Sequence, residues 1–103
     1  MATFILFSRL TDEGRRTLKA RPERLQEVNA ELETMGGRVT AQFAVLGLYD
    51  FVSFVEAASN EVIARISVEL GSRGTLQITT FPALSIEALV ETLKGGATRG
   101  TQP

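Results

Sequence analysis

Apolar and β-branched residues gather in four short segments of the chain, and each segment has the composition or the alternation of a β-strand. The predicted strands are residues 3–8, 38–46, 51–57 and 75–81. Residues 38–46 alternate regularly, and one face of that strand is expected to carry Val39, Ala41, Phe43 and Val45. Pro82 is expected to end the last strand, because proline has no backbone N–H for the ladder.

Helical spacing fills the segments between these strands. Thr11 is a candidate N-cap, and the helix that begins there is expected to give way to a second one near Pro22. The second helix has an apolar stripe and ends at a glycine pair: Leu25, Val28, Leu32 and Met35, then Gly36-Gly37. Ser59 opens a third helix, which residues 71–74 close. Ser85 opens a last amphipathic helix with Ile86, Leu89, Val90 and Leu93.

The resulting order is β-α-β-β-α-β followed by a helix. With right-handed crossovers, this order predicts an α+β, ferredoxin-like fold with a four-stranded antiparallel sheet. A chain of 103 residues has the length of one domain, and we expect that domain over residues 1–94. Residues 95–103 have nothing to pack and are expected to be a disordered tail.

Large apolar side chains occupy both faces of the two middle strands, although the helices of this fold cover only one face. The residues concerned are Phe43, Leu46, Phe51 and Phe54. An apolar surface of that size usually meets a partner. A second copy is the natural partner here, which predicts a homodimer or a multiple of it in the form of a dimeric α/β barrel. The alternative is a monomer with a few exposed hydrophobic residues.

Composition excludes several classes of function. The chain has no cysteine and no histidine, which removes disulfides, thiolate nucleophiles, imidazole catalysis and the usual zinc and haem ligands. No cofactor and no metal site is predicted. The formal net charge is −1 and the basic residues are scattered, so no nucleic-acid surface is expected. The apolar run at residues 3–8 is too short for a signal peptide or a membrane span, and a soluble, cytoplasmic protein is predicted.

The segment LGLYDFV at residues 46–52 contains the candidate binding residues. Gly47 suits a tight turn, and Asp50 can accept hydrogen bonds from nearby backbone amides. Under one interpretation these residues only set the register of a hairpin. Under the other, Tyr49 and Asp50 face a cavity between the sheet and its partner layer, where they orient a small polar ligand or move a proton.

Two further polar residues are candidates for the wall of that cavity. Glu56 shares the parity of Val52 and Phe54, so it is expected either partly buried with a raised pKa, or solvated or salt-bridged at the strand end. Thr80 is a short polar group on the last predicted strand, where ordinary β-propensity also explains it. A ligand at this place is expected to be small and largely apolar with one polar end.

The chain resembles the GYD-domain family of small bacterial proteins over nearly its whole length, to about Leu93. The residues that carry the resemblance are Thr11 with the following DEG, Pro22-Glu23-Arg24, Gly36-Gly37, residues 46–52, residues 55–57, Gly74 and Thr80. The resemblance implies a ferredoxin-like, dimeric α/β-barrel fold and no particular activity. Arg21, Val45 and Ala58 depart from the family pattern, and Val45 removes a polar group from one face.

Three functions remain open at this level. The first is an oligomeric module that binds a small molecule between the open sheet and its partner. The second is a cofactor-free enzyme, such as a monooxygenase or an isomerase, which would depend on Tyr49, Asp50 and Glu56. The third is a purely structural or protein-interaction subunit.

Overall fold

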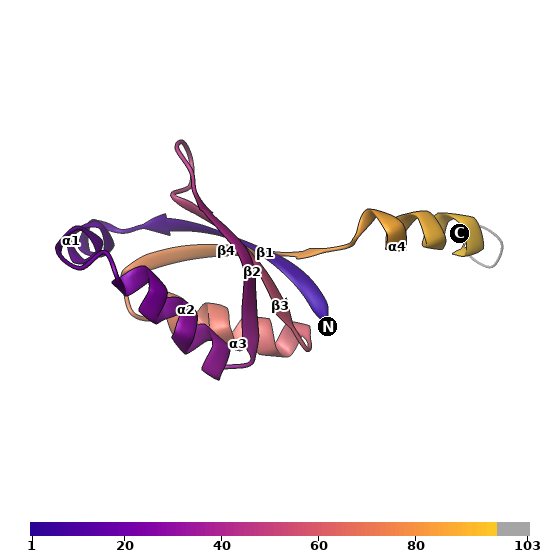
Figure 1. Ribbon diagram of the computed structural model, residues 1–103, viewed down its shortest axis with the longest axis horizontal. Helices are drawn as coiled ribbons and strands as arrows, with labels where there is room; N and C mark the ends of the chain where they lie inside the picture. Colours follow the sequence, from indigo (N-terminus) through magenta and orange to yellow (C-terminus); the bar gives the residue numbers. More distant parts are fainter. Residues whose placement is uncertain (97–103) are drawn as a thin grey trace.

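A computed structural model describes residues 1–96, and in these residues four strands form one antiparallel sheet in the order β2-β3-β1-β4 (Figure 1). The strands are β1 (Ala2–Leu10), β2 (Gly37–Ala44), β3 (Phe51–Ala57) and β4 (Leu76–Ala83). The helices are α1 (Asp12–Ala20), α2 (Arg24–Thr34), α3 (Asn60–Gly71) and α4 (Ile86–Glu91), and α4 continues into a π-helical turn, η1 (Thr92–Gly96). The predicted α+β, ferredoxin-like arrangement is confirmed.

Three helices begin where the sequence predicts, because a hydroxyl caps each of them. The side chains of Thr11, Ser59 and Ser85 accept hydrogen bonds from the third residue on, at 3.1, 3.2 and 3.0 Å. Each hydroxyl satisfies an amide that has no partner inside the helix. The break between α1 and α2 falls at Arg21–Glu23, around Pro22 as expected.

The core lies between the sheet and one layer of helices. Helices α2 and α3 cover the same face of the sheet, as Figure 1 shows. The side chains from both layers that make up the core are Phe4, Leu6, Leu32, Val55, Ala57, Ile63, Ile66 and Leu70. Along β3 the burial alternates strictly: Phe51, Ser53, Val55 and Ala57 are buried, and the residues between them are half-exposed.

The regular alternation expected over residues 38–46 is wrong, because β2 contains a bulge at Thr40. Val39 lies opposite Val55 in the core, whereas Ala41 lies opposite Phe54 on the other face. The bulge therefore moves Val39 away from the face of Ala41 and Phe43. The Thr40 hydroxyl donates to the Phe54 carbonyl oxygen at 3.2 Å. The strand also ends at Ala44 instead of residue 46.

Pro82 does not end the last strand, which continues to Ala83. Strand β4 is at the edge of the sheet, and its only neighbour is β1 among the described residues. An edge strand tolerates proline, because one side of its backbone has no ladder partner. After Ala83 the chain leaves the body, and α4 projects away from the sheet (Figure 1).

The expected tail lies mostly outside the described part of the chain. Residues 97–103 are not described, and residues 95 and 96 belong to η1. In residues 1–96 no helix has both the length and the apolar character that a membrane span requires.

Candidate functional site

Asp50 ties the β2–β3 hairpin to the end of β1. Its carboxylate accepts a hydrogen bond from the Leu10 amide at 2.8 Å, and its own amide donates to the Ser8 carbonyl at 2.8 Å. Its carbonyl accepts from the Val45 amide at 2.8 Å and closes the base of the hairpin. Gly47 lies at the tip with a φ of +135°, where only glycine is free of strain. Asp50 and Gly47 thus have a structural explanation in this chain.

Tyr49 lies on the face of the sheet that has no helices. Its ring packs against Phe7 with centroids 5.0 Å apart, and Phe7 in turn contacts Phe81 edge-on at 5.5 Å. Such aromatic contacts stabilise beyond the area they bury. Tyr49 is therefore one end of an aromatic row that crosses from the hairpin to β4.

The other two candidate residues lie elsewhere. Glu56 is at the opposite end of β3 and accepts a hydrogen bond from Arg38 of β2 at 2.9 Å. Thr80 faces the helices, and its hydroxyl shares a hydrogen bond of 2.8 Å with Ser67 of α3. The structure thus keeps Tyr49 and Asp50 together as chain neighbours and separates them from Glu56 and Thr80. A ligand-binding role for these four residues stays a prediction.

We expect Asp50→Ala to lower the free energy of unfolding by about 1.5–3 kcal/mol, because the half-buried Leu10 amide loses a charged acceptor. Asp50→Asn keeps an acceptor oxygen and should lose clearly less. Urea denaturation of both variants beside the native protein measures the difference. An Asp50→Ala midpoint equal to the native one would remove the structural role assigned to the carboxylate.

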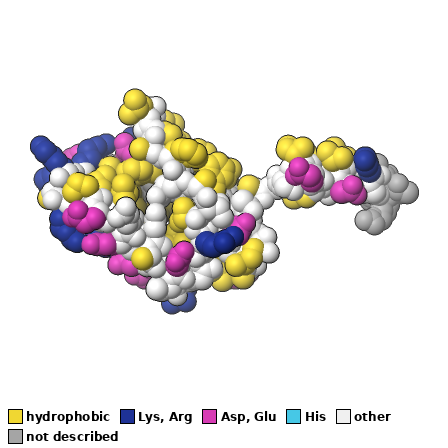
Figure 2. All heavy atoms as spheres, viewed as in Figure 1, with side chains coloured by type: hydrophobic (Ala, Val, Ile, Leu, Met, Phe, Trp, Pro, Cys, Tyr) yellow, Lys and Arg dark blue, Asp and Glu magenta, His cyan; other side chains and the backbone are white. Residues whose placement is uncertain are grey.

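The side of the sheet without helices is a mainly apolar surface, which we call the open face. Its apolar and aromatic residues are Ile5, Phe7, Ala41, Phe43, Tyr49, Val52, Phe54 and Phe81, and Thr3 and Thr79 lie on the same side. Phe43 is 58% exposed and Phe81 is 47% exposed. Charged side chains on this side occur at the strand ends, at Arg9 and at the Arg38–Glu56 pair. Figure 2 shows hydrophobic side chains along this side of the body and at the hairpin tip.

The projecting α4–η1 segment, residues 86–96, is a second apolar surface, which we call the arm. It has no buried residue within α4. Its exposed apolar positions follow a helical stripe at Ile86, Leu89, Val90 and Leu93. Figure 2 shows hydrophobic side chains along one edge of this segment and acidic ones on the other. The predicted amphipathic helix is present, and its apolar stripe is exposed to solvent in the single chain.

A cavity of about 140 Å³ lies on the helix side of the sheet, and we call it the helix-side cavity. Its walls come from the sheet, α1, α2 and the end of α3, and most of the lining is aliphatic. Ser8 and Ser53, only 7% and 6% exposed, stand in its sheet wall. Beside them the Asn29 amide donates to Gln42 at 2.8 Å, and the Gln42 amide donates to Ser53 at 2.9 Å. Tyr49, Asp50, Glu56 and Thr80 do not line this cavity.

Sequence reasoning missed the helix-side cavity, although one signal for it was present. Ser8 follows Phe4 and Leu6 on the core face of β1, and Ser53 lies between Phe51 and Val55 on the core face of β3. Polar residues at core positions require hydrogen-bond partners, so each of them marks a place where the core is not simply apolar.

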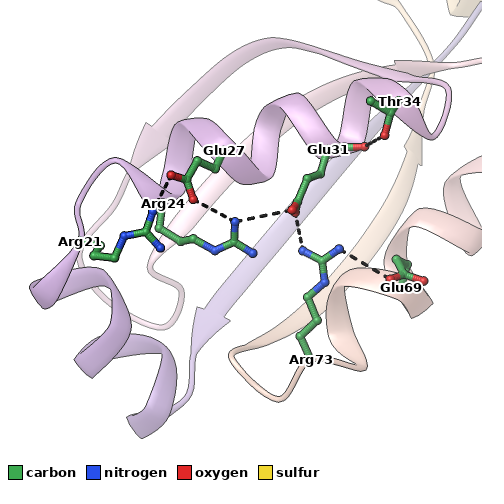
Figure 3. A network of polar contacts seen from close by, with 7 residues as sticks. All are labelled: Arg21, Arg24, Glu27, Glu31, Thr34, Glu69 and Arg73. Carbon is green, nitrogen blue, oxygen red and sulfur yellow. Dashed lines mark hydrogen bonds and ion pairs between the residues drawn. The ribbon is translucent and has the colours of Figure 1, made fainter.

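An ion-pair network joins α2 to the end of α3 beside the cavity (Figure 3). Arg24 contacts Glu27 at 3.1 Å and Glu31 at 3.6 Å, and Arg73 bonds Glu31 and contacts Glu69 at 3.6 Å. The hydrogen bond from Arg73 holds the pKa of Glu31 below its ordinary value, and the same bond raises the pKa of Arg73. Both arginines of the cavity lining are thus already paired at neutral pH.

Comparison with known proteins identifies relatives over most of the chain. The profile of the GYD domain matches residues 4–93. A protein of Thermus thermophilus, named glutamine synthetase and cystathionine beta-lyase binding protein, is 50% identical over 95 residues. The match covers 91% of this chain and 100% of that protein.

Two solved structures are also similar to the chain. A crystal structure of a Thermus thermophilus protein has 20% identity and a TM-score of 0.54, and it covers 82% of this chain and 95% of its own. A dimeric ferredoxin-like protein from an uncultured marine organism has 12% identity and a TM-score of 0.39, with coverage of 84% and 95%. The first of these supports the fold described above.

Proposed function

This chain belongs to the GYD domain family, and from that premise we propose that it is a protein-binding module that works as a homodimer and binds glutamine synthetase, cystathionine beta-lyase or both. One observation carries the proposal: a relative that is half identical, and that this chain covers over its full length, is named for binding these two enzymes. We also propose a cytoplasmic location, as the sequence predicts.

The open face is the surface proposed for the second copy. It has an apolar centre and charges only at the strand ends, so two copies related by a two-fold axis bring like apolar surfaces together. Phe43 and Phe81 are exposed in one chain, and a facing sheet would remove their rings from water. This arrangement is the dimeric α/β barrel expected from the sequence.

The arm is the surface proposed for the enzymes. An amphipathic helix with apolar residues three and four apart is a common form of peptide recognition, in which the stripe enters a groove of the partner. The arm stands away from the body and buries none of the residues of α4, so its stripe is accessible for such a contact.

The cofactor-free enzyme has no comparable support in the geometry. Its three candidate groups were Tyr49, Asp50 and Glu56. The Asp50 carboxylate is bonded to the Leu10 amide, and Glu56 is paired with Arg38 at the far end of β3. General acid–base chemistry needs such groups within hydrogen-bond reach of one substrate.

The double substitution Leu89→Asp, Leu93→Asp tests the role of the arm. We expect it to weaken binding to immobilised enzyme at least about 100-fold, because two carboxylates would enter an apolar groove. The mass of the dimer should not change. Surface plasmon resonance with each purified enzyme measures the affinity, and light scattering measures the mass.

Glu87→Gln with Glu91→Gln is the matched control on the other residues of α4, and it should bind within about threefold of the native protein. If the leucine variant instead loses the dimer, the arm contacts the second copy and the assignment is wrong. If it binds the enzymes as the native protein does, the enzymes contact another surface.

A further inference from the structure

We propose that the helix-side cavity binds a small uncharged molecule. The apolar body of this ligand is about the size of a six-membered ring, and its one polar end forms a hydrogen bond with the Ser8 hydroxyl. The proposal concerns a face of the sheet that neither the second copy nor the enzymes are proposed to use. It does not depend on the proposed function.

The size and the lining of the cavity define the apolar body of the ligand. A cavity of about 150 Å³ lined by Leu, Ile and Phe is large enough to bind benzene, and the helix-side cavity measures about 140 Å³. Aliphatic side chains line most of it, from both the sheet and the helices: Leu6, Leu18, Leu25, Val28, Leu32 and Ile78. These walls match an apolar ring.

Ser8 defines the polar end of the ligand. Its side chain lines the sheet wall of the cavity and is 7% exposed, and no fully buried side-chain polar atom of residues 1–96 lacks a hydrogen-bond partner. The neighbouring polar groups are occupied, because Asn29, Gln42 and Ser53 bond one another in a row. Because the Ser8 side chain lines the cavity, its hydroxyl offers one donor and an acceptor to a ligand with one hydroxyl, carbonyl or amide group.

The charges near the cavity favour an uncharged ligand. Arg24 and Arg73 are the charged residues of its lining, and both are paired with glutamates. The network around them holds three arginines, Arg21, Arg24 and Arg73, and four glutamates, Glu23, Glu27, Glu31 and Glu69. A carboxylate ligand would have to displace Glu31 from the guanidinium groups of Arg24 and Arg73. The four glutamates of the network outnumber its three arginines, so the network as a whole would repel that ligand.

A surface groove gives the ligand an approach. The groove is lined by Pro22, Glu23, Leu25, Gln26, Asn29 and Gln42. Three of these residues, Leu25, Asn29 and Gln42, also line the cavity. The hydrogen-bonded pair of Asn29 and Gln42 therefore borders both spaces.

Titration of the isotope-labelled full chain with phenol, toluene and benzoate, followed by nuclear magnetic resonance, tests the proposal. We expect phenol to bind with a dissociation constant of about 0.1–1 mM and to shift the amide signals of Ser8, Ser53 and Leu25. Benzoate, which has a similar ring but a charge, should bind at least about tenfold more weakly.

Ser8→Ala should weaken phenol about three- to tenfold and leave toluene unchanged, because only phenol uses the hydroxyl. Ser67→Ala, the same change outside the cavity, should affect neither probe. Val28→Phe fills the cavity and should abolish both.

Three results would overturn the proposal. They are the absence of phenol binding up to about 10 mM, shifts confined to the open face or the arm, and equal affinity of Ser8→Ala and native protein for phenol. Equal phenol affinity of the Ser8→Ala and native proteins would overturn the proposal even if Val28→Phe fails to fold.

Discussion

Phe81→Glu should abolish the proposed homodimer, of twice 11.2 kDa, and leave a monomer of 11.2 kDa at micromolar concentration. The ring of Phe81 is 47% exposed in the single chain and lies against Phe7 on the open face. A carboxylate at this position would be buried without a partner between two apolar surfaces, which costs several kcal/mol. The dissociation constant of the dimer is therefore expected to rise at least about 100-fold. Multi-angle light scattering measures the mass.

Val68→Glu is the matched control for this substitution. Val68 is 71% exposed on α3, in the helix layer on the other side of the sheet, so a carboxylate there should leave the dimer intact. Phe43→Glu repeats the test from the opposite edge of the open face and should also yield a monomer. Phe81→Glu and Phe43→Glu proteins that both remain dimeric would show that the second copy binds elsewhere.

Gly14→Ala should cost about 3 kcal/mol of stability, the upper end of the usual range for overpacking. A Cβ atom on Gly14 would lie 2.1 Å from the carbonyl oxygen of Thr75, which is a backbone atom and has little room to move. Two hydrogen bonds hold the start of α1 in this place. The Thr11 amide donates to the Thr75 carbonyl at 3.1 Å, and the Thr11 hydroxyl donates to the Gly74 carbonyl at 2.7 Å.

Gly71→Ala provides the control, because a Cβ on Gly71 meets no atom within 4 Å at the end of α3. That change should be neutral or should stabilise by up to about 1 kcal/mol, as alanine favours a helix over glycine. Urea denaturation of the two variants makes the comparison. Equal midpoints for both would contradict the close contact between α1 and the segment before β4.

The sequence predicted the elements whose signals are local. The hydroxyl caps at Thr11, Ser59 and Ser85 and the strand at residues 51–57 depend on neighbouring residues alone, and the structure places all of them as expected. Two segments that carry the family resemblance join distant parts of the chain. Thr11 bonds the backbone of Gly74 and Thr75 before β4, and Asp50 of the segment 46–52 bonds the backbone of Ser8 and Leu10 at the end of β1.

Other features depend on contacts that the sequence does not display. The bulge at Thr40 is a property of the pairing of β2 with β3, and the regular alternation of residues 38–46 gives no sign of it. The helix-side cavity depends on how α1 and α2 meet the sheet over Ser8 and Ser53. The effect of Pro82 on β4 also depends on the position of that strand at the edge of the sheet, and the local sequence does not show that position.

Sedimentation velocity of the fluorescently labelled protein with purified glutamine synthetase, and separately with cystathionine beta-lyase, tests most directly whether this chain is a protein-binding module. The proposed function predicts that the label moves with at least one enzyme at low micromolar concentration, and that the Leu89→Asp, Leu93→Asp variant stays behind as a free dimer. A label that sediments alone in the presence of each enzyme, up to about 100 μM, would contradict it.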